Sequence, residues 1–404
     1  MGEGKGATSF TRILEAIASF GHEVHVSLPA PLGEEAPPTE DYRGFSMHRA
    51  PTRKRLLPTA DLPLPLRLYD RVACYLRYQR WADRTAGALA AAVRPDLILS
   101  MGTFEVPAAR RLGTKLGVPN VTRLFGNGLA MYMRDPKRFY ANFPEVLAFR
   151  TPADLLILTN DGADGEKLAR RLHVPAERFV HLRNGLDFEV FTPGPPSGEV
   201  RRRLGLNPSQ PLLLTVTRLA REKMLGRAIG ALPELLRSRP DAVLALVGEG
   251  PEREALESQA RDLGVTAALR FPGAVANREL PDWYRHAGLV LSLLDRTNAS
   301  NPVFEAMACE RVVVALDAGM THEIVKDGET GVLVRRSDLP RLGSILAGLL
   351  DDPERRRRMG EAAHRHIRSL LVSPKERLAR EVHLLEEVVL RSRGARGTIA
   401  GDAR

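Results

Sequence analysis

The sequence predicts an α/β protein made of two doubly wound, Rossmann-like halves. Short apolar runs alternate with segments of helical periodicity along most of the chain. The length of 404 residues suits about two domains. The Pro-rich stretch 192–198 is typical of a stiff linker between them. We therefore expect an N-terminal domain, a C-terminal domain, a final helix and a disordered tail, over residues 1–192, 193–373, 374–392 and 393–404.

The chain opens with a Gly-rich segment that contains Gly4 and Gly6, a helix over Ala7–Phe20 and a strand over Glu23–Leu28. In a doubly wound sheet, the strand ahead of the Gly-rich loop is the central one. No such strand precedes Gly4 here. Either the true start lies upstream, or the N-terminal sheet lacks its first strand. We favour the upstream start, because a gap would expose two unpaired strand edges.

The rest of the first half continues the alternation of strands and helices. Residues 33–62 are rich in Pro and Arg, and there only Phe45–His48 indicates a short strand. A long amphipathic helix is predicted over Leu66–Val93. Strands are predicted over 95–100, 120–125, 155–159 and 179–182, with helices over 108–116 and 165–172.

A basic region with interleaved aromatic rings runs from Tyr42 to Trp81. Nine Arg or Lys residues stand there against Asp61 and Asp70, with Tyr69, Tyr75 and Tyr78 among them. Such a pattern can lie on an anionic bilayer. It is equally typical of a solvated helix face with a half-buried aromatic side. Both interpretations stay open at the level of the sequence.

The second half repeats the pattern after the linker. Its strands are predicted over 212–216, 242–247, 268–271, 288–294 and 311–316. Its helices are predicted over 225–237, 252–263, 279–286, 301–309, 339–351, 353–369 and 374–391. Parallel sheets covered on both faces by helices follow from this order, with ligands expected at the carboxyl ends of the strands, in a cleft between the two sheets.

Composition narrows the functional classes. The apolar fraction of 44% and charged fraction of 27% are those of a soluble globular protein. The sequence has no apolar run long enough to span a membrane and no apolar leader, and Cys74 and Cys309 fit no metal spacing. We expect two buried thiols and a cytoplasmic protein. The net charge of +10 favours an anionic partner, and without a nucleic-acid module we expect no nucleic acid.

The stretch Thr297–Cys309 is the first candidate binding element. Asn301 is a good N-cap and Pro302 suits the first helical position. A helix that starts at a strand end presents amide donors and a positive dipole end to an anion. Glu305, one turn in, can accept hydrogen bonds from a hydroxylated ligand. The alternative is an ordinary strand–helix turn with a solvated Glu.

Other candidates follow neighbouring strand ends. Arg218 comes directly after a strand and Lys223 lies five residues on, so that two cations can neutralise a diphosphate without a metal. Gly248 and Gly250 permit close backbone approach to a flat ligand. Glu323 follows another strand end. Taken singly, the arginine can be a surface residue and the glycines plain turn residues.

These stretches together resemble the retaining glycosyltransferases of the GT-B fold, family 4 type. The matching segments are Asn184–Asp187, Thr217–Lys223, Val247–Pro251, Phe271–Gly273, Glu305–Cys309, Glu323–Val325 and Asp327–Gly331. The resemblance implies a nucleotide-diphosphate sugar as donor and co-substrate, held by the C-terminal domain. A glycan or lipid-linked acceptor would lie on the N-terminal domain. It also implies retention of anomeric configuration, no metal and no further cofactor.

The resemblance also implies residue roles. Arg218 and Lys223 would hold the diphosphate, and Glu305 the ribose. The donor site would further include Gly248, Gly250, Thr297, Asn301, Val303 and Phe304. The acceptor side would include Gly4, Gly6, Phe125 and Gly126. The final helix would return to the N-terminal domain.

The chain departs from the family pattern on the sugar side. The family carries two Glu with seven residues between them, and the corresponding position, eight before Glu305, holds Thr297. Asp295, Thr297 or Asn298 are candidates to replace that first Glu. Phe125-Gly126 stands where the family often has His-Gly. Alternatives are therefore an accessory protein that binds nucleotide sugars with an impaired site, and a nucleotide-sugar epimerase.

Overall fold

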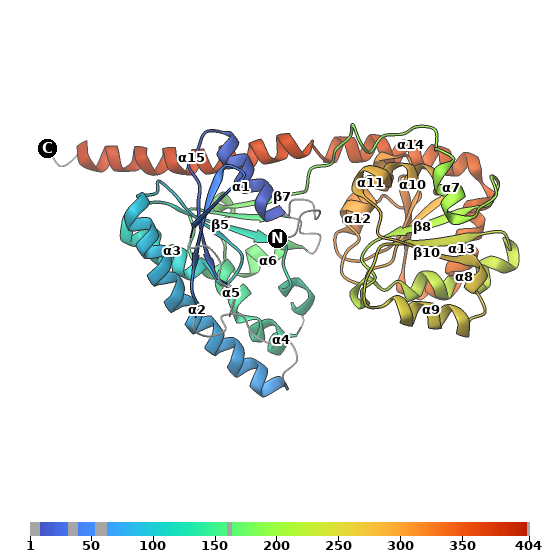
Figure 1. Cartoon of the computed structure of the whole chain (residues 1–404), viewed down its shortest axis with the longest axis horizontal. Helices are drawn as coiled ribbons and strands as arrows, with labels where there is room; N and C mark the ends of the chain where they lie inside the picture. The colour runs from blue at the N-terminus through green and yellow to red at the C-terminus, as the bar shows by residue number, and fades with distance from the viewer. Residues whose placement is uncertain (1–8, 31–38, 53–62, 134, 160–163, 402–404) are drawn as a thin grey trace. The chain divides into compact units, whose positions relative to one another are not determined.

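The computed structural model describes residues 9–30, 39–52, 63–133, 135–159 and 164–401 (Figure 1). The described chain divides into two compact units. The N-terminal unit holds the described residues up to Arg183, except Asp164, together with Lys375 onward, and the C-terminal unit holds Asn184–Pro374. Residues 184–192 belong to the C-terminal unit because Phe191 is buried in its core and the Leu186 amide donates to the Val372 carbonyl oxygen, at 3.0 Å.

The C-terminal unit is built on one parallel sheet. Its strands lie in the order β10-β9-β8-β11-β12-β13, so that the first strand in the chain is central, as in a doubly wound sheet. The strands are β8 (Leu212–Val216), β9 (Val243–Val247), β10 (Leu269–Gly273), β11 (Leu289–Ser292), β12 (Val313–Leu316) and β13 (Gly331–Val334).

Helices cover both faces of this sheet, which is why strands such as β9 are continuously apolar and buried. One face packs against α7 (Glu199–Leu204), α10 (Leu280–His286), α11 (Asn301–Ala308) and α14 (Pro353–Leu370). The other face packs against α8 (Gly226–Ser238), α9 (Arg253–Asp262) and α13 (Leu342–Asp351). A short helix, α12 (Thr321–Ile324), follows β12.

The N-terminal unit carries two sheets. In the first, β1 (His25–Pro29) pairs in parallel with β3 (Phe45–Ala50), which pairs antiparallel with β2 (Thr39–Tyr42). The second is parallel, with β4 (Ile98–Met101), β5 (Asn120–Phe125), β6 (Leu155–Thr159) and β7 (Phe179–Leu182) in chain order. Among the described residues, no strand joins β1 to β4. This is the arrangement expected of a doubly wound sheet without its first strand.

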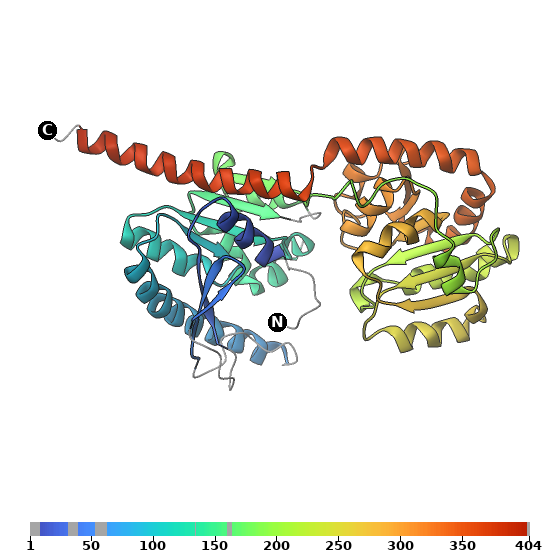
Figure 2. The same cartoon turned by 45° about the horizontal axis from the view of Figure 1, so that its top comes forward.

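Helices from both ends of the chain complete the N-terminal unit. They are α1 (Ser9–Ser19), α2 (Leu64–Val93), α3 (Val106–Leu116), α4 (Pro136–Ala141), α5 (Phe143–Arg150), α6 (Gly165–Arg171) and α15 (Pro374–Gly401). Figures 1 and 2 show α15 running alongside the strands of this unit, and its Leu385 and Val388 pack with Val121 and Ile157 of the sheet.

The expectation of a disordered tail over 393–404 is wrong for the described part of that segment. Helix α15 continues to Gly401. Gly394 and Gly397 lower helix propensity by about 1 kcal/mol each but keep their backbone N–H groups, so the helical hydrogen bonds need not end there. Residues 402–404 lie outside the described chain.

Candidate functional site

The candidate site lies where the central strands of the C-terminal sheet end. Loops leave the carboxyl ends of β8, β9 and β11 at one edge, because all three strands are parallel. A pocket opens at this edge between the β8 and β11 loops and the start of α11. Its lining includes Thr217 and Lys223 after β8, Leu294 after β11, and Pro302 and Val303 in α11.

The pocket brings together some of the predicted residues. Lys223 and Val303 line it. Arg218 stands beside the lining residue Thr217 but points to solvent, where it forms an ion pair of 2.9 Å with Glu222. This exposed pair stabilises the fold by little, so the guanidinium can exchange Glu222 for a ligand anion at small cost. The other donor-side residues, Gly248, Gly250, Thr297, Asn301, Phe304 and Glu305, do not line this pocket in the described chain.

Gly248 and Gly250 lie directly against the loop that carries Arg218. A Cβ atom at Gly248 would lie 1.9 Å from the carbonyl oxygen of Thr217, and one at Gly250 would lie 2.2 Å from that of Leu219. Backbone hydrogen bonds hold the two loops together; for example, the Leu219 N–H donates to the Glu249 carbonyl oxygen at 2.9 Å. These glycines therefore let two loops touch and fix the backbone on either side of Arg218. The neighbour that each Cβ would meet is another part of the chain, and a donor contact at these glycines stays a prediction.

The start of α11 differs by one residue from the prediction. Ser300 is the N-cap, with extended dihedrals, and Asn301 is the first helical residue. The amides of Val303 and Phe304 both donate to the Ser300 carbonyl oxygen, at 3.0 and 3.1 Å. They are thus already bonded, and the helix offers an anion its dipole rather than these two donors. The Asn301 side chain accepts a hydrogen bond from the Asn184 amide at 3.1 Å.

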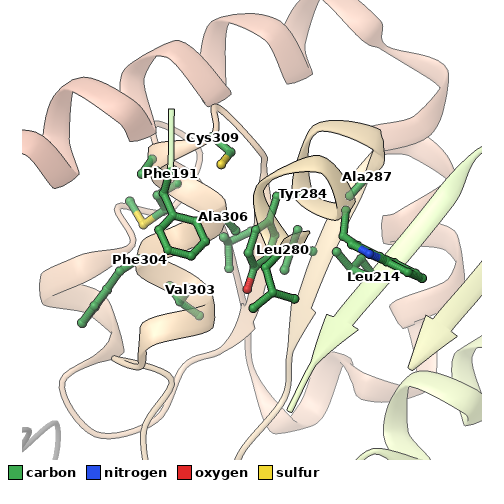
Figure 3. Close-up of a cluster of buried hydrophobic side chains, with 14 of the residues drawn as sticks. Phe191, Leu214, Leu280, Tyr284, Ala287, Val303, Phe304, Ala306 and Cys309 are labelled. Atoms are coloured by element: carbon green, nitrogen blue, oxygen red, sulfur yellow. The ribbon is translucent and has the colours of Figure 1, made fainter. Parts of the chain in front are cut away.

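Glu305 is buried inside the unit. Its Oε2 accepts a hydrogen bond of 2.8 Å from the Tyr284 hydroxyl, and only 7% of the residue is exposed. Burial raises the pKa of the Glu305 carboxyl, while the bond from Tyr284 lowers it. Figure 3 shows the Tyr284 ring between α11, which carries Val303 and Phe304, and the Leu214 side of the core. Tyr284 therefore holds the carboxylate in place from α10.

The three candidates to replace the family's first Glu all form ion pairs or hydrogen bonds within the protein. Asp295 forms ion pairs of 2.8 Å with both Arg227 and Arg336. Thr297 accepts the Ala299 amide at 3.2 Å. Asn298 is fully buried and bonds to Ser292, Leu294, Leu316 and Thr321, which pins the loop between β11 and α11.

On the N-terminal unit, Phe125 and Gly126 lie at the end of β5. Phe125 is 40% exposed, and the Arg123 guanidinium carbon lies 4.4 Å from its ring centre. Gly126 takes a left-handed conformation with φ of 80°, which favours glycine. Gly4 and Gly6 lie outside the described residues.

Sequence reasoning missed Tyr284 and Arg123, and it named Asn298 only as a substitute for the family's first Glu, not as the residue that pins the loop. A buried tyrosine on one helix and a carboxylate on the next carry no shared periodic signal. An Asn-Ala-Ser stretch looks like any polar turn. Arg123 did interrupt an apolar strand, and that interruption was a usable signal. Both cysteines are buried, as expected.

Two family models match the chain. The model described as "Glycosyl transferases group 1" matches residues 197–366, and "Glycosyl transferase 4-like domain" matches residues 6–185. Both units of the chain match glycosyltransferase family models. The first model covers most of the C-terminal unit and the second most of the N-terminal unit.

Curated relatives are similar over part of their length. The chain is 36% identical over 197 residues to a GDP-mannose-dependent α-(1-6)-phosphatidylinositol monomannoside mannosyltransferase of Mycolicibacterium smegmatis, which covers 46% of this chain and 51% of that protein. It is 29% identical over 296 residues, 70% of each chain, to D-inositol 3-phosphate glycosyltransferase 1 of Catenulispora acidiphila. The chain spans about half the length of the first curated relatives it matches.

Solved structures give the fold. A sucrose-phosphate synthase from Thermosynechococcus elongatus matches with a TM-score of 0.71 at 20% identity, covering 95% of this chain and 93% of that one. The chain has the GT-B fold, with two Rossmann-like α/β domains.

Proposed function

We propose that this protein transfers a sugar from a nucleotide-diphosphate sugar to a glycan or lipid-linked acceptor, with retention of anomeric configuration and without a metal. The observation that carries the proposal is the pocket at the end of β8 and β11, lined by Lys223 and the start of α11. The two family-model matches support the same activity. The described residues contain no cluster of three or more His, Cys, Asp or Glu side chains placed to hold a metal ion.

In the proposed reaction the C-terminal unit stabilises the leaving group. Lys223 in the pocket and Arg218 beside it would neutralise the negative charge that develops on the departing diphosphate. The positive end of the α11 dipole would add to this. By family analogy the acceptor hydroxyl passes its proton to the departing phosphate, so no side-chain base is required. Glu305, positioned by Tyr284, would accept hydrogen bonds from the ribose.

Activity measurements with a panel of nucleotide sugars test this proposal. Arg218→Ala and Lys223→Ala should each lower kcat/KM by about a hundredfold or more, as expected for loss of a charged contact in the transition state. Arg221→Ala is the matched control, because Arg221 lies in the same loop and does not line the pocket. Unchanged rates in both variants would overturn the assignment. Nucleotide binding without transfer of any donor would identify an accessory protein instead.

A membrane-surface acceptor is a further part of the proposal. The first turns of α2 expose large apolar side chains, with Leu66, Tyr69 and Leu76 at 56%, 75% and 50%. Tyr75 and Tyr78 instead pack inward against Phe104. The basic region thus splits into a core side and an exposed apolar side. We propose that the exposed side rests on an anionic membrane surface, on the inner face in the cytoplasmic location that we expect.

Vesicle flotation tests the membrane contact. Binding should require anionic lipid, weaken with added salt, and fall when Leu66 and Tyr69 are replaced by Ser. Binding that ignores lipid charge and these substitutions would contradict it. No helix among the described residues combines the length and apolar content needed to cross a bilayer.

A further inference from the structure

A second pocket lies at the opposite edge of the C-terminal sheet. It is lined by Leu212 at the start of β8, Gly288 just before β11 and Val312 just before β12. Because these strands are parallel, their amino ends share one edge of the sheet. Arg218 and Lys223 follow the carboxyl end of β8, so this pocket is separate from the candidate donor site.

Arginines from four places in the chain converge on this pocket. They are Arg201 in α7, Arg239 after α8, Arg311 between α11 and β12, and Arg356 and Arg357 in the first turns of α14 (Figure 1). Among the described lining residues, Glu310 is the one carboxylate. Convergence from such distant segments is a property of the fold rather than of a local basic run.

Several of these guanidinium groups are held by neutral partners. Arg311 Nε donates to the Cys309 carbonyl oxygen at 3.0 Å, and Arg201 Nη1 donates to that of Gln210 at 3.1 Å. Arg356 Nη1 donates to the Leu349 carbonyl oxygen. Such bonds to carbonyl oxygens fix the side chains in place without pairing them with a carboxylate. Carboxylates pair with the other two, as in Arg239 with Asp351 at 2.8 Å and Arg357 with Glu361 at 2.7 Å.

Burial disfavours the charge on two of these arginines. It lowers the pKa of Arg311, and it lowers that of Arg356, where the nearby Arg239 and Arg311 act in the same direction and Asp352 and Asp351 act against it. Helix α14 also begins here, with Pro353 in the lining, so its positive dipole end adds to the field. A bound anion would relieve both effects.

His286 adds a second kind of contact. Its Nε2 bonds to the Ser197 carbonyl oxygen, so that nitrogen carries the proton. The residue lines the pocket, and its buried Nδ1, an acceptor, has no partner among the described residues. An acceptor among arginines suits an anion that also carries a hydroxyl, and a phosphate group that keeps one proton has that combination.

We propose that this pocket binds a phosphate-bearing anion, at a site distinct from the nucleotide-sugar donor site. Arginine guanidinium groups match phosphate oxygens in geometry and charge. Glu310, Asp351 and Glu361 would repel a large anion. They therefore favour a compact ligand that reaches Arg311 and Arg356.

Calorimetry with inorganic phosphate and pyrophosphate tests the proposal. The donor site is first silenced by Arg218→Ala with Lys223→Ala, so that remaining binding reports on the second pocket. Adding Arg356→Gln with Arg357→Gln should weaken binding by about tenfold or more, because two charge-assisted contacts are lost. Arg355→Gln with Arg358→Gln is the matched control, since it removes equal charge from the same helix outside the pocket lining.

Lipid vesicles distinguish a soluble phosphate ligand from a lipid headgroup. One set contains phosphatidylcholine alone, and the other contains phosphatidylcholine with one-fifth phosphatidic acid, whose headgroup is a phosphate monoester. Binding of free phosphate or pyrophosphate that the pocket variant alone weakens supports a soluble ligand. Binding to phosphatidic acid vesicles alone, weakened in the same way, supports a lipid headgroup. Equal binding by pocket and control variants, or no binding of any probe by a protein with unchanged thermal unfolding, overturns the proposal.

Discussion

In the C-terminal unit the central strand β8 pairs with β9 on one side and β11 on the other, whereas in the N-terminal unit β1 and β4 each end a sheet among the described strands. The sheet of the C-terminal unit is thus held together by hydrogen bonds to its central strand. The two sheets of the N-terminal unit depend instead on the helices that pack against them. The same doubly wound pattern therefore tolerates two different ways of holding a core together.

The N-terminal unit relies on α15, which comes from the far end of the chain. Leu385 and Val388 of this helix fill the apolar part of the contact. Beside them Arg123 of β5, fully buried, bonds to Glu381, which also pairs with Arg377 at 2.7 Å. Burial lowers the pKa of Arg377. Buried charges of this kind are costly when one partner is removed, which makes the cluster sensitive to single substitutions.

The largest effect is expected for Glu381→Gln. This change leaves two buried guanidinium groups without their carboxylate, and it should destabilise the N-terminal unit by about 3–5 kcal/mol. Thermal or denaturant unfolding followed separately for the two units would measure it. The C-terminal unit should be little affected, because Glu381 and its partners Arg123 and Arg377 all belong to the N-terminal unit.

Glu386→Gln is the control for that experiment. Glu386 lies on the same helix but is partly exposed and pairs with His22 and His383 at the surface. Its loss should cost less than about 1 kcal/mol. Equal destabilisation by the two variants would mean that the buried cluster does not secure the N-terminal unit.

The next effect is expected in the C-terminal unit, for Gly250→Ala. The new Cβ would lie 2.2 Å from the Leu219 carbonyl oxygen, so the loop that carries Arg218 must move. We expect a loss of stability of about 1–3 kcal/mol and a marked rise in KM for the donor. Gly348→Ala, in α13 with nothing within 4 Å of the new atom, should instead stabilise by about 0.5–1 kcal/mol. A donor KM that is unchanged in Gly250→Ala would separate this loop from the donor site.

A smaller effect, dependent on pH, is expected for Glu305→Gln. Glutamine can still accept the Tyr284 hydroxyl but does not ionise. Burial raises the pKa of Glu305 in the folded protein, so the unfolded chain loses this proton first as pH rises above the ordinary glutamate value of 4.5. The wild type should therefore lose stability relative to the variant between acid and neutral pH. Unfolding midpoints of the two proteins at a series of pH values would measure it, and a constant difference would contradict the assignment.

The same contrast explains what the sequence could predict. Apolar runs such as those of β8 and β9 are continuous, so the sequence predicts these strands and their succession along the chain. Strand β13 and the hairpin of β2 and β3 were harder, because they are short and depend on partners distant in sequence. Arg218 and Lys223 predicted a donor loop, which stays a prediction. The bond from Tyr284 to Glu305 and the cluster around Arg123 arise only from tertiary packing.

The smallest effect concerns the edges of the N-terminal sheets. Backbone amides on the outer edges of β1 and β4 should exchange with solvent deuterium at least about tenfold faster than those of β8, which has neighbours on both sides. Inner-edge amides of β1, which bond to β3, serve as the internal control. Protection of the β1 outer edge equal to that of β8 would show that another segment pairs with it in solution. The two units would then differ only in how their helices pack, since each would have a central strand with neighbours on both sides.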